Sequence, residues 1–129
     1  MIAVDTNVLV RFLLQDDARQ SARARALFET QVIFLPSTVL LETFWVLRTL
    51  LHQPQPAIAR LLSAVTRLPN VEVEDAARLD RAFALTEAGM GFADALHLTA
   101  AVPDMRFATF DQGLIRAARR SGLSTAFAP

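Results

Sequence analysis

Four carboxylates lie directly after or within apolar segments of this chain, where the presence of an acidic residue calls for an explanation. They are Asp5, Glu42, Asp94 and Asp111. The first and the last each follow a short apolar run directly, and the middle two interrupt apolar segments with helical spacing. Burying an unpaired carboxylate is costly unless a charge or a metal ion compensates for the lost hydration. These four acids are therefore the candidate functional residues.

Each acid also has a structural explanation when it is taken alone. Asp5 and Asp111 are suited to cap the helices that follow them. Glu42 lies in an apolar segment predicted to be a mostly buried helix, where an ion pair with an arginine would satisfy it. Asp94 would be favoured in a first helical turn by the helix dipole. Their convergence favours function, because a parallel sheet brings residues at its carboxyl ends to one edge.

The residue types that the sequence lacks narrow the chemistry of such a site. The chain has no Lys, Cys or Tyr, and its histidines are His52 and His97. This excludes P-loop and Schiff-base chemistry, thiol nucleophiles and zinc sites made of cysteines or several histidines. Four clustered carboxylates repel one another unless a cation neutralises them. Oxygen ligands alone indicate Mg²⁺ or Mn²⁺, which activate water and stabilise the charge on a phosphodiester under attack.

Polar and cationic residues near the four acids are candidates for supporting roles. Those expected to hold carboxylates or water in place are Thr6, Asn7, Ser37 and Thr109. Those expected to contact a substrate phosphate are Arg11, His97 and Arg116. The alternatives stay open here, since arginines on amphipathic helices are commonly solvated and a lone histidine is commonly structural.

Short apolar runs alternate with segments of helical periodicity along the whole chain. The predicted strands are 2–4, 32–35, 71–73, 107–110 and 124–127, and the predicted helices are 6–14, 18–30, 38–51, 56–65, 76–88, 91–102 and 112–120. Ser37 is the expected N-cap of the third helix, Trp45 an expected core residue, and Pro103 the expected end of the sixth helix. Apolar strands alternating with helices predict an α/β fold. We expect a single domain over 1–129, a three-layer α/β/α sandwich with a short, mainly parallel central sheet.

The composition bears on partners and location. Hydrophobic residues make up 53% of the chain, mean hydropathy is +0.32, and 13 acidic residues balance 13 basic ones. The apolar excess suggests a surface covered by a partner, and zero net charge argues against a general nucleic-acid coat. The start of the chain lacks a basic, apolar targeting signal, and no long uncharged stretch exists. We therefore expect a cytoplasmic protein without a membrane segment.

The motifs around the four acids resemble those of PIN-domain nucleases. Val4–Leu9 resembles the opening strand and turn of that family, and Ser37–Glu42 resembles its second motif. Gly89–His97 resembles the third motif and Ala108–Asp111 the fourth. Each motif is weak alone, but four in order across a chain of this length are specific.

The compact form is similar to VapC-type toxins of bacterial toxin–antitoxin pairs. The resemblance implies a Mg²⁺- or Mn²⁺-dependent endoribonuclease, usually a homodimer, that a cognate antitoxin inhibits. It implies that the four acids form the catalytic and metal-binding quartet, with Thr6, Asn7 and Thr109 as polar companions. Many relatives carry a further acid where this chain has Gly91, so an additional metal-holding role at that position is not expected.

Two other functions remain open from the sequence. One is a PIN nuclease of RNA maturation, which would not arrest growth when expressed. The other is a non-catalytic interaction module whose acids serve as caps and ion-pair partners. A receiver domain also gathers acids at strand ends, but it depends on a lysine that this chain lacks.

Overall fold

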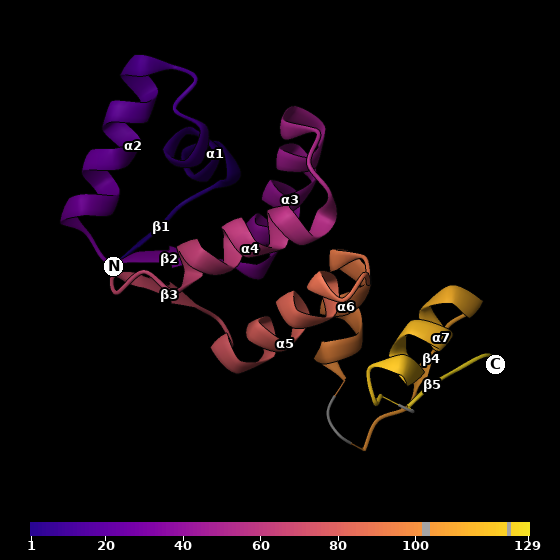
Figure 1. Ribbon diagram of the computed structural model, residues 1–129. Helices are drawn as coiled ribbons and strands as arrows, with labels where there is room; N and C mark the ends of the chain where they lie inside the picture. The colour runs from indigo at the N-terminus through magenta and orange to yellow at the C-terminus, as the bar shows by residue number, and fades with distance from the viewer. Residues whose placement is uncertain (102–103, 124) are drawn as a thin grey trace.

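The structure is a computed structural model that describes residues 1–101, 104–123 and 125–129 (Figure 1). The predicted ends of the sixth helix at Val102 and Pro103 and of the last strand at Ser124 lie outside these residues. The strands are β1 (Ile2–Ala3), β2 (Ile33–Leu35), β3 (Val71–Val73), β4 (Phe107–Ala108) and β5 (Ala126–Phe127). The helices are α1 (Thr6–Leu14), α2 (Ala18–Thr30), α3 (Ser37–Leu51), α4 (Gln55–Thr66), α5 (Ala76–Glu87), α6 (Phe92–Ala100) and α7 (Gln112–Arg120).

The first sheet has the order β1-β2-β3, and all its strands run parallel. Its register pairs Ile2 with Ile33 and Ile33 with Val71. Ile33 is fully buried, as expected for the central strand of a parallel sheet that helices cover. The predicted α/β fold with short parallel strands is therefore confirmed.

The core around α6 depends on three stacked aromatic rings. Phe92, at the start of α6, is only 1% exposed. Its ring centroid lies 4.8 Å from that of Phe44 in α3 and 5.2 Å from that of Phe83 in α5. Such aromatic pairs add to the stabilisation from apolar burial. They fix the first turn of α6, which carries Asp94, between α3 and α5.

The strands divide between two sheets in the described residues, and the sequence had predicted one. β4 and β5 form a separate parallel pair that α7 covers; we call 104–129, without Ser124, the C-terminal unit. In Figure 1, α5 and α6 lie between the first sheet and this unit. Membership of a sheet depends on contacts between distant residues, and patterns along two-residue strands carry no information about them.

Two expectations for α3 are wrong. Its buried residues are Leu40, Thr43, Phe44 and Leu47, while Glu42 is exposed and Trp45 is 56% exposed. The residue before the helix is Pro36, so Ser37 is the first helical residue and not its N-cap. Because the outer face of α3 is also apolar, the sequence predicted a helix that is buried on every side. No other described element covers that outer face at Trp45.

The helices of the described residues are short or carry charged side chains. None combines the length and the apolar character needed to cross a bilayer.

Candidate functional site

Asp5 lies two residues after β1 and is the N-cap of α1. Its Oδ1 accepts a hydrogen bond from the backbone N–H of Val8, with 3.1 Å between nitrogen and oxygen. The extended backbone at Asp5 directs the side chain over the first turn of the helix, as in an ordinary N-cap. The side chain is exposed, so its second oxygen, Oδ2, is accessible to another ligand.

Glu42 and Asp94 lie on two helices that contact each other. Glu42 is one turn into α3 on its exposed face, and Asp94 is half-buried in the first turn of α6. A methyl group built on Gly91 would lie 3.5 Å from Asp94 Oδ2 and 4.0 Å from Gln55 Oε1. Gln55 at the start of α4 therefore borders the Asp94 site, and nothing in the sequence pattern indicated it.

Asp111 repeats the geometry of Asp5 in the other sheet. Its Oδ1 accepts from the backbone N–H of Leu114 at 3.0 Å, and its own backbone N–H donates to Thr109 Oγ1 at 3.0 Å. Thr109 thus orients the turn that presents the carboxylate, which agrees with a supporting role. Asp111 belongs to the C-terminal unit, whereas the other three acids belong to elements of the larger part of the fold (Figure 1).

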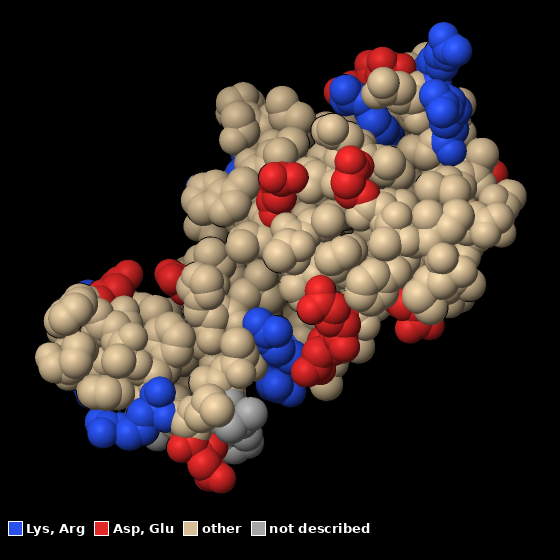
Figure 2. Space-filling view, turned by 180° about the vertical axis from the view of Figure 1, so that it is seen from behind, with Lys and Arg blue, Asp and Glu red and all other residues tan. Residues whose placement is uncertain are grey.

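The four acids are not gathered into one cluster. In the described part of the chain, no three Asp, Glu or His side chains lie close enough together to hold a metal ion. On the face shown in Figure 2, acidic side chains are spread over several separate places. The elements of Asp5, Glu42 and Asp94 are neighbours, because α1 packs against α3 and α3 contacts α6.

Ion pairing does not account for these acids. The ion pairs among the described residues are Arg11–Asp16 at 2.9 Å and Arg67–Asp80 at 3.5 Å. None of the four candidates takes part in them, so the internal ion pair considered for Glu42 is not formed. Carboxylate oxygens without cationic partners are the hard ligands that Mg²⁺ and Mn²⁺ take. The donor chemistry therefore fits such a cation.

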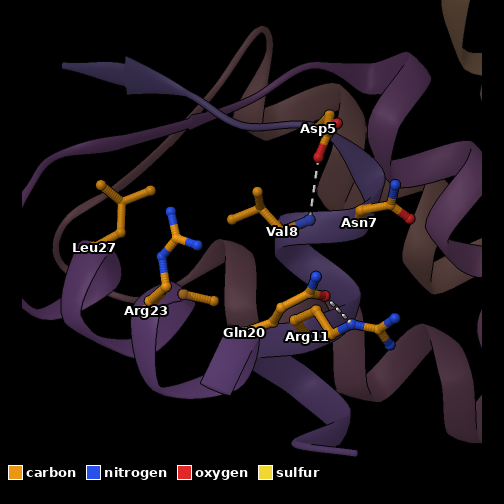
Figure 3. A pocket seen from close by; sticks show the side chains of 8 residues that line it. Asp5, Asn7, Val8, Arg11, Gln20, Arg23 and Leu27 are labelled. Atoms are coloured by element: carbon orange, nitrogen blue, oxygen red, sulfur yellow. Dashed lines mark hydrogen bonds between the residues drawn. The ribbon is translucent and has the colours of Figure 1, made fainter. Parts of the chain in front are cut away.

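A pocket of about 420 Å³ opens beside Asp5, between α1 and α2 (Figure 3). The side chains that line it are Asp5, Asn7, Val8, Arg11, Gln20, Arg23, Ala24 and Leu27. Two arginines beside a carboxylate give a place where a phosphate and a cation can be held together. Arg23 is not among the residues that the sequence marked as candidates, and only the packing of the two helices reveals its position.

The two arginines of the pocket differ in their partners. Arg11 Nε donates to Gln20 Oε1 at 2.8 Å, and its Nη1 donates to Asp16 Oδ1 at 2.9 Å. These bonds hold Arg11 in one orientation along the pocket wall. Arg23 is exposed and takes no part in the ion pairs of the described residues, which leaves its guanidinium available for a substrate.

The remaining predicted residues lie in different surroundings. Thr6 is buried at the start of α1, and Asn7 is exposed at the pocket. The backbone N–H of Ser37 donates to Glu74 Oε1 at 2.7 Å, which places one more acid at the carboxyl end of the sheet. The sequence signal for Glu74 is the alternation of valine and glutamate over residues 71–74. His97 on α6 and Arg116 on α7 are both exposed.

Acids that follow parallel strands, with arginines nearby, define a class of α/β proteins suited to metal-assisted chemistry on phosphates. A family model described as the PIN domain matches residues 2–120, and the chain belongs to that family. PIN domains are generally nucleases, which are hydrolases, so membership supports a nuclease. Searches of curated proteins and of solved structures found no match.

Proposed function

We propose that this protein is a metal-dependent endoribonuclease toxin that hydrolyses RNA phosphodiester bonds and is inhibited by a cognate antitoxin. The catalytic and metal-binding residues in this proposal are Asp5, Glu42, Asp94 and Asp111, and the cation is Mg²⁺ or Mn²⁺. The observation that carries it is the match of residues 2–120 to the PIN family together with four acids that no described cation pairs with.

When bound, the cation supplies charge neutralisation and a more acidic water molecule. The residues of the chain bind and orient the substrate around it. Asp5 and Asp111 are fixed by their capping hydrogen bonds, so they keep their orientation without a ligand. Arg11 and Arg23 bind a phosphate next to the scissile bond, and exposed His97 and Arg116 contact the RNA further along.

Charge over the rest of the surface supports an RNA substrate. Basic side chains gather over α2 and over the C-terminal unit in Figure 2. The arginines of α2 are Arg19, Arg23 and Arg25, and those of α7 are Arg116, Arg119 and Arg120. Basic groups on both sides of an acidic site attract a polyanion although the net charge of the chain is zero.

The experiment is cleavage of single-stranded and hairpin RNA by the purified protein with Mn²⁺, compared with Asp5→Asn and Asp94→Asn. We expect cleavage by the unaltered protein, little by either variant, and none after chelation. Equal activity in all three proteins would refute the catalytic assignment. An absence of any metal-induced rise in Tm would favour the non-catalytic interaction module.

Expression in cells separates a toxin from a nuclease of RNA maturation. We expect expression to arrest growth, and co-expression of a small protein encoded beside this chain to relieve the arrest. Normal growth with retained RNA cleavage in the test tube would favour RNA maturation. Sedimentation tests the homodimer that the resemblance implies, and we propose that the protein is one.

A further inference from the structure

The first sheet ends at β1, and the outer edge of β1 is open in the described structure. The backbone N–H groups of Ile2 and Val4 donate to carbonyls of Val32 and Phe34, at 2.8 and 3.3 Å. Because neighbouring residues of a strand point their N–H groups to opposite sides, Ala3 points its N–H and C=O away from β2. Ala3 is exposed. The edge therefore offers a parallel strand one donor and one acceptor.

The second sheet has a matching open edge at β4. Phe107 donates to the carbonyl of Thr125 at 3.0 Å, and Thr109 donates to that of Phe127 at 2.9 Å. Ala108 between them therefore points its N–H and C=O away from β5, and it too is exposed. Both open edges belong to parallel sheets, and both are centred on an alanine.

Exposed apolar side chains accompany both edges. Ile2 is 38% exposed in β1, and Phe110, directly after β4, is 83% exposed. An open strand edge beside exposed apolar groups is a template for pairing with another strand. Joining the two edges would satisfy both sets of backbone groups and cover part of this apolar surface.

Pairing β1 with β4 would also bring two of the acids together. Asp5 lies two residues beyond Ala3, and Asp111 lies three residues beyond Ala108. Opposite residues of a parallel pair do not both bond across it, so the two alanines are offset by one residue. With Ala3 opposite Thr109, the N–H of Ala3 reaches the carbonyl of Ala108, and Asp5 stands opposite Asp111 at the carboxyl end of the sheet. The proposed metal site at Asp5 would then include Asp111, which lies apart from the other three acids in the described structure.

A second copy of this chain is the partner that fits the arrangement. α5 and α6 lie between β1 and the β4 of the same chain (Figure 1), and these two strands are not paired in the described structure. We propose that two copies exchange their C-terminal units, β4 of each copy pairing with β1 of the other, so that Asp111 completes the metal site of the partner copy. The β4 edge of each copy pairs with the β1 edge of the other, so no open edge is left over and the assembly is a closed two-fold dimer.

The role of Asp111 in this dimer rests on the proposed function, but the strand exchange can be measured without any activity. Side chains of directly opposite residues share one face of a sheet, and Ile2 stands opposite Ala108 in this register. The chain has no cysteine, so Ile2→Cys and Ala108→Cys give defined thiols. Co-expressed single variants, treated with a short thiol crosslinker, should yield a covalent dimer. Neither variant alone should yield one. The matched control replaces Ala108→Cys with Ala64→Cys, on the exposed side of α4, and should yield no dimer.

The double cysteine variant decides between exchange and pairing within one chain. Exchange predicts a covalent dimer of this variant, whereas pairing within one chain predicts a crosslinked monomer. A monomer in sedimentation together with only the crosslinked monomer would overturn the proposal. Ala3→Pro removes the outward N–H of β1 and leaves its bonds to β2, so we expect a folded monomer from it.

Complementation then tests whether Asp111 acts across the dimer. In a mixed dimer of Asp5→Asn and Asp111→Asn chains, exchange leaves one site with both acids intact. With random pairing we expect about a quarter of the unaltered activity from two chains that are inactive alone. No recovery, with dimers crosslinked as above, would show that Asp111 does not act in trans. If the unaltered protein cleaves no RNA, the proposed function fails, and the crosslinks still report on the exchange.

Discussion

Asp5 and Asp111 make the same hydrogen bond in two different sheets. Each follows a strand, and each accepts from the backbone N–H three residues later, at 3.1 Å for Val8 and 3.0 Å for Leu114. Asp17 and Asp75 make this bond at α2 and α5 as well, so capping by itself does not mark a functional acid. Asp75 also lies two residues after a parallel strand, as Asp5 does, so that position does not mark a functional acid either. What Asp5 adds to its capping bond is the pocket that it lines together with Arg11 and Arg23.

Asp5→Asn should separate the capping role from the metal-binding role. Asparagine caps helices about as well as aspartate, so we expect the free energy of unfolding without metal to change by less than about 0.5 kcal/mol. The Mn²⁺-induced rise in Tm should disappear, and RNA cleavage should fall by about 100-fold. Calorimetry with and without Mn²⁺ measures the first effect, and an RNA cleavage assay measures the second.

Asp17→Asn is the matched control for that variant. Asp17 caps α2 with the same bond, to the N–H of Gln20 at 2.9 Å, but it is not one of the four candidate ligands. The Tm of the Asp17→Asn variant should still rise with Mn²⁺. Loss of the metal response in both variants would point to a general effect of lost charge and not to a site at Asp5.

Glu42→Gln should reduce activity without reducing stability. The side chain is exposed and joins no ion pair of the described residues, so its neutralisation breaks no contact in the fold. We expect a urea midpoint close to that of the unaltered protein and a large loss of metal-dependent cleavage. The control Glu87→Gln changes an exposed acid on α5, and it should leave both the urea midpoint and the metal-dependent cleavage unchanged. Full cleavage by the Glu42 variant would exclude it from the site.

Arg23→Gln should weaken substrate binding more than catalysis. Arg23 lines the pocket beside Asp5, and a lost phosphate contact should raise KM for RNA by about tenfold with little change in kcat. The salt dependence of RNA binding should also become shallower, by about one counterion. Arg19→Gln on the same helix, outside the residues that line the pocket, provides the comparison. Equal effects of both variants would indicate a diffuse electrostatic contribution.

Two neighbouring aromatic residues test the orientation of α3. Phe44 is 2% exposed and stacks on Phe92, whereas Trp45 is 56% exposed. We expect Phe44→Ala to lower the free energy of unfolding by about 3–5 kcal/mol and Trp45→Ala to change it by less than about 0.5 kcal/mol. Urea unfolding of the two variants measures both values. The reverse order would mean that α3 is rotated about its axis.

Local features of this protein follow from the sequence alone. Short apolar runs indicated the strands, and Asp5 and Asp111 indicated where α1 and α7 begin. Each of these features depends on residues close together in the chain, through the pleat of a strand or a capping bond over three residues. The positions of the four acids at strand ends and on helices could be predicted for the same reason.

Contacts between distant residues were decided by the tertiary structure. The sequence does not encode locally which strand edges meet, so the division into two sheets and the separation of Asp111 from Asp5 were not predicted. Burial of an apolar residue depends on whether another element covers it, and this reversed the expectation for Trp45. The pocket at Arg23 arises where α1 packs on α2. The sequence thus determined which acids are available for chemistry, and packing decided which of them face one another, because distance in space depends on the whole fold.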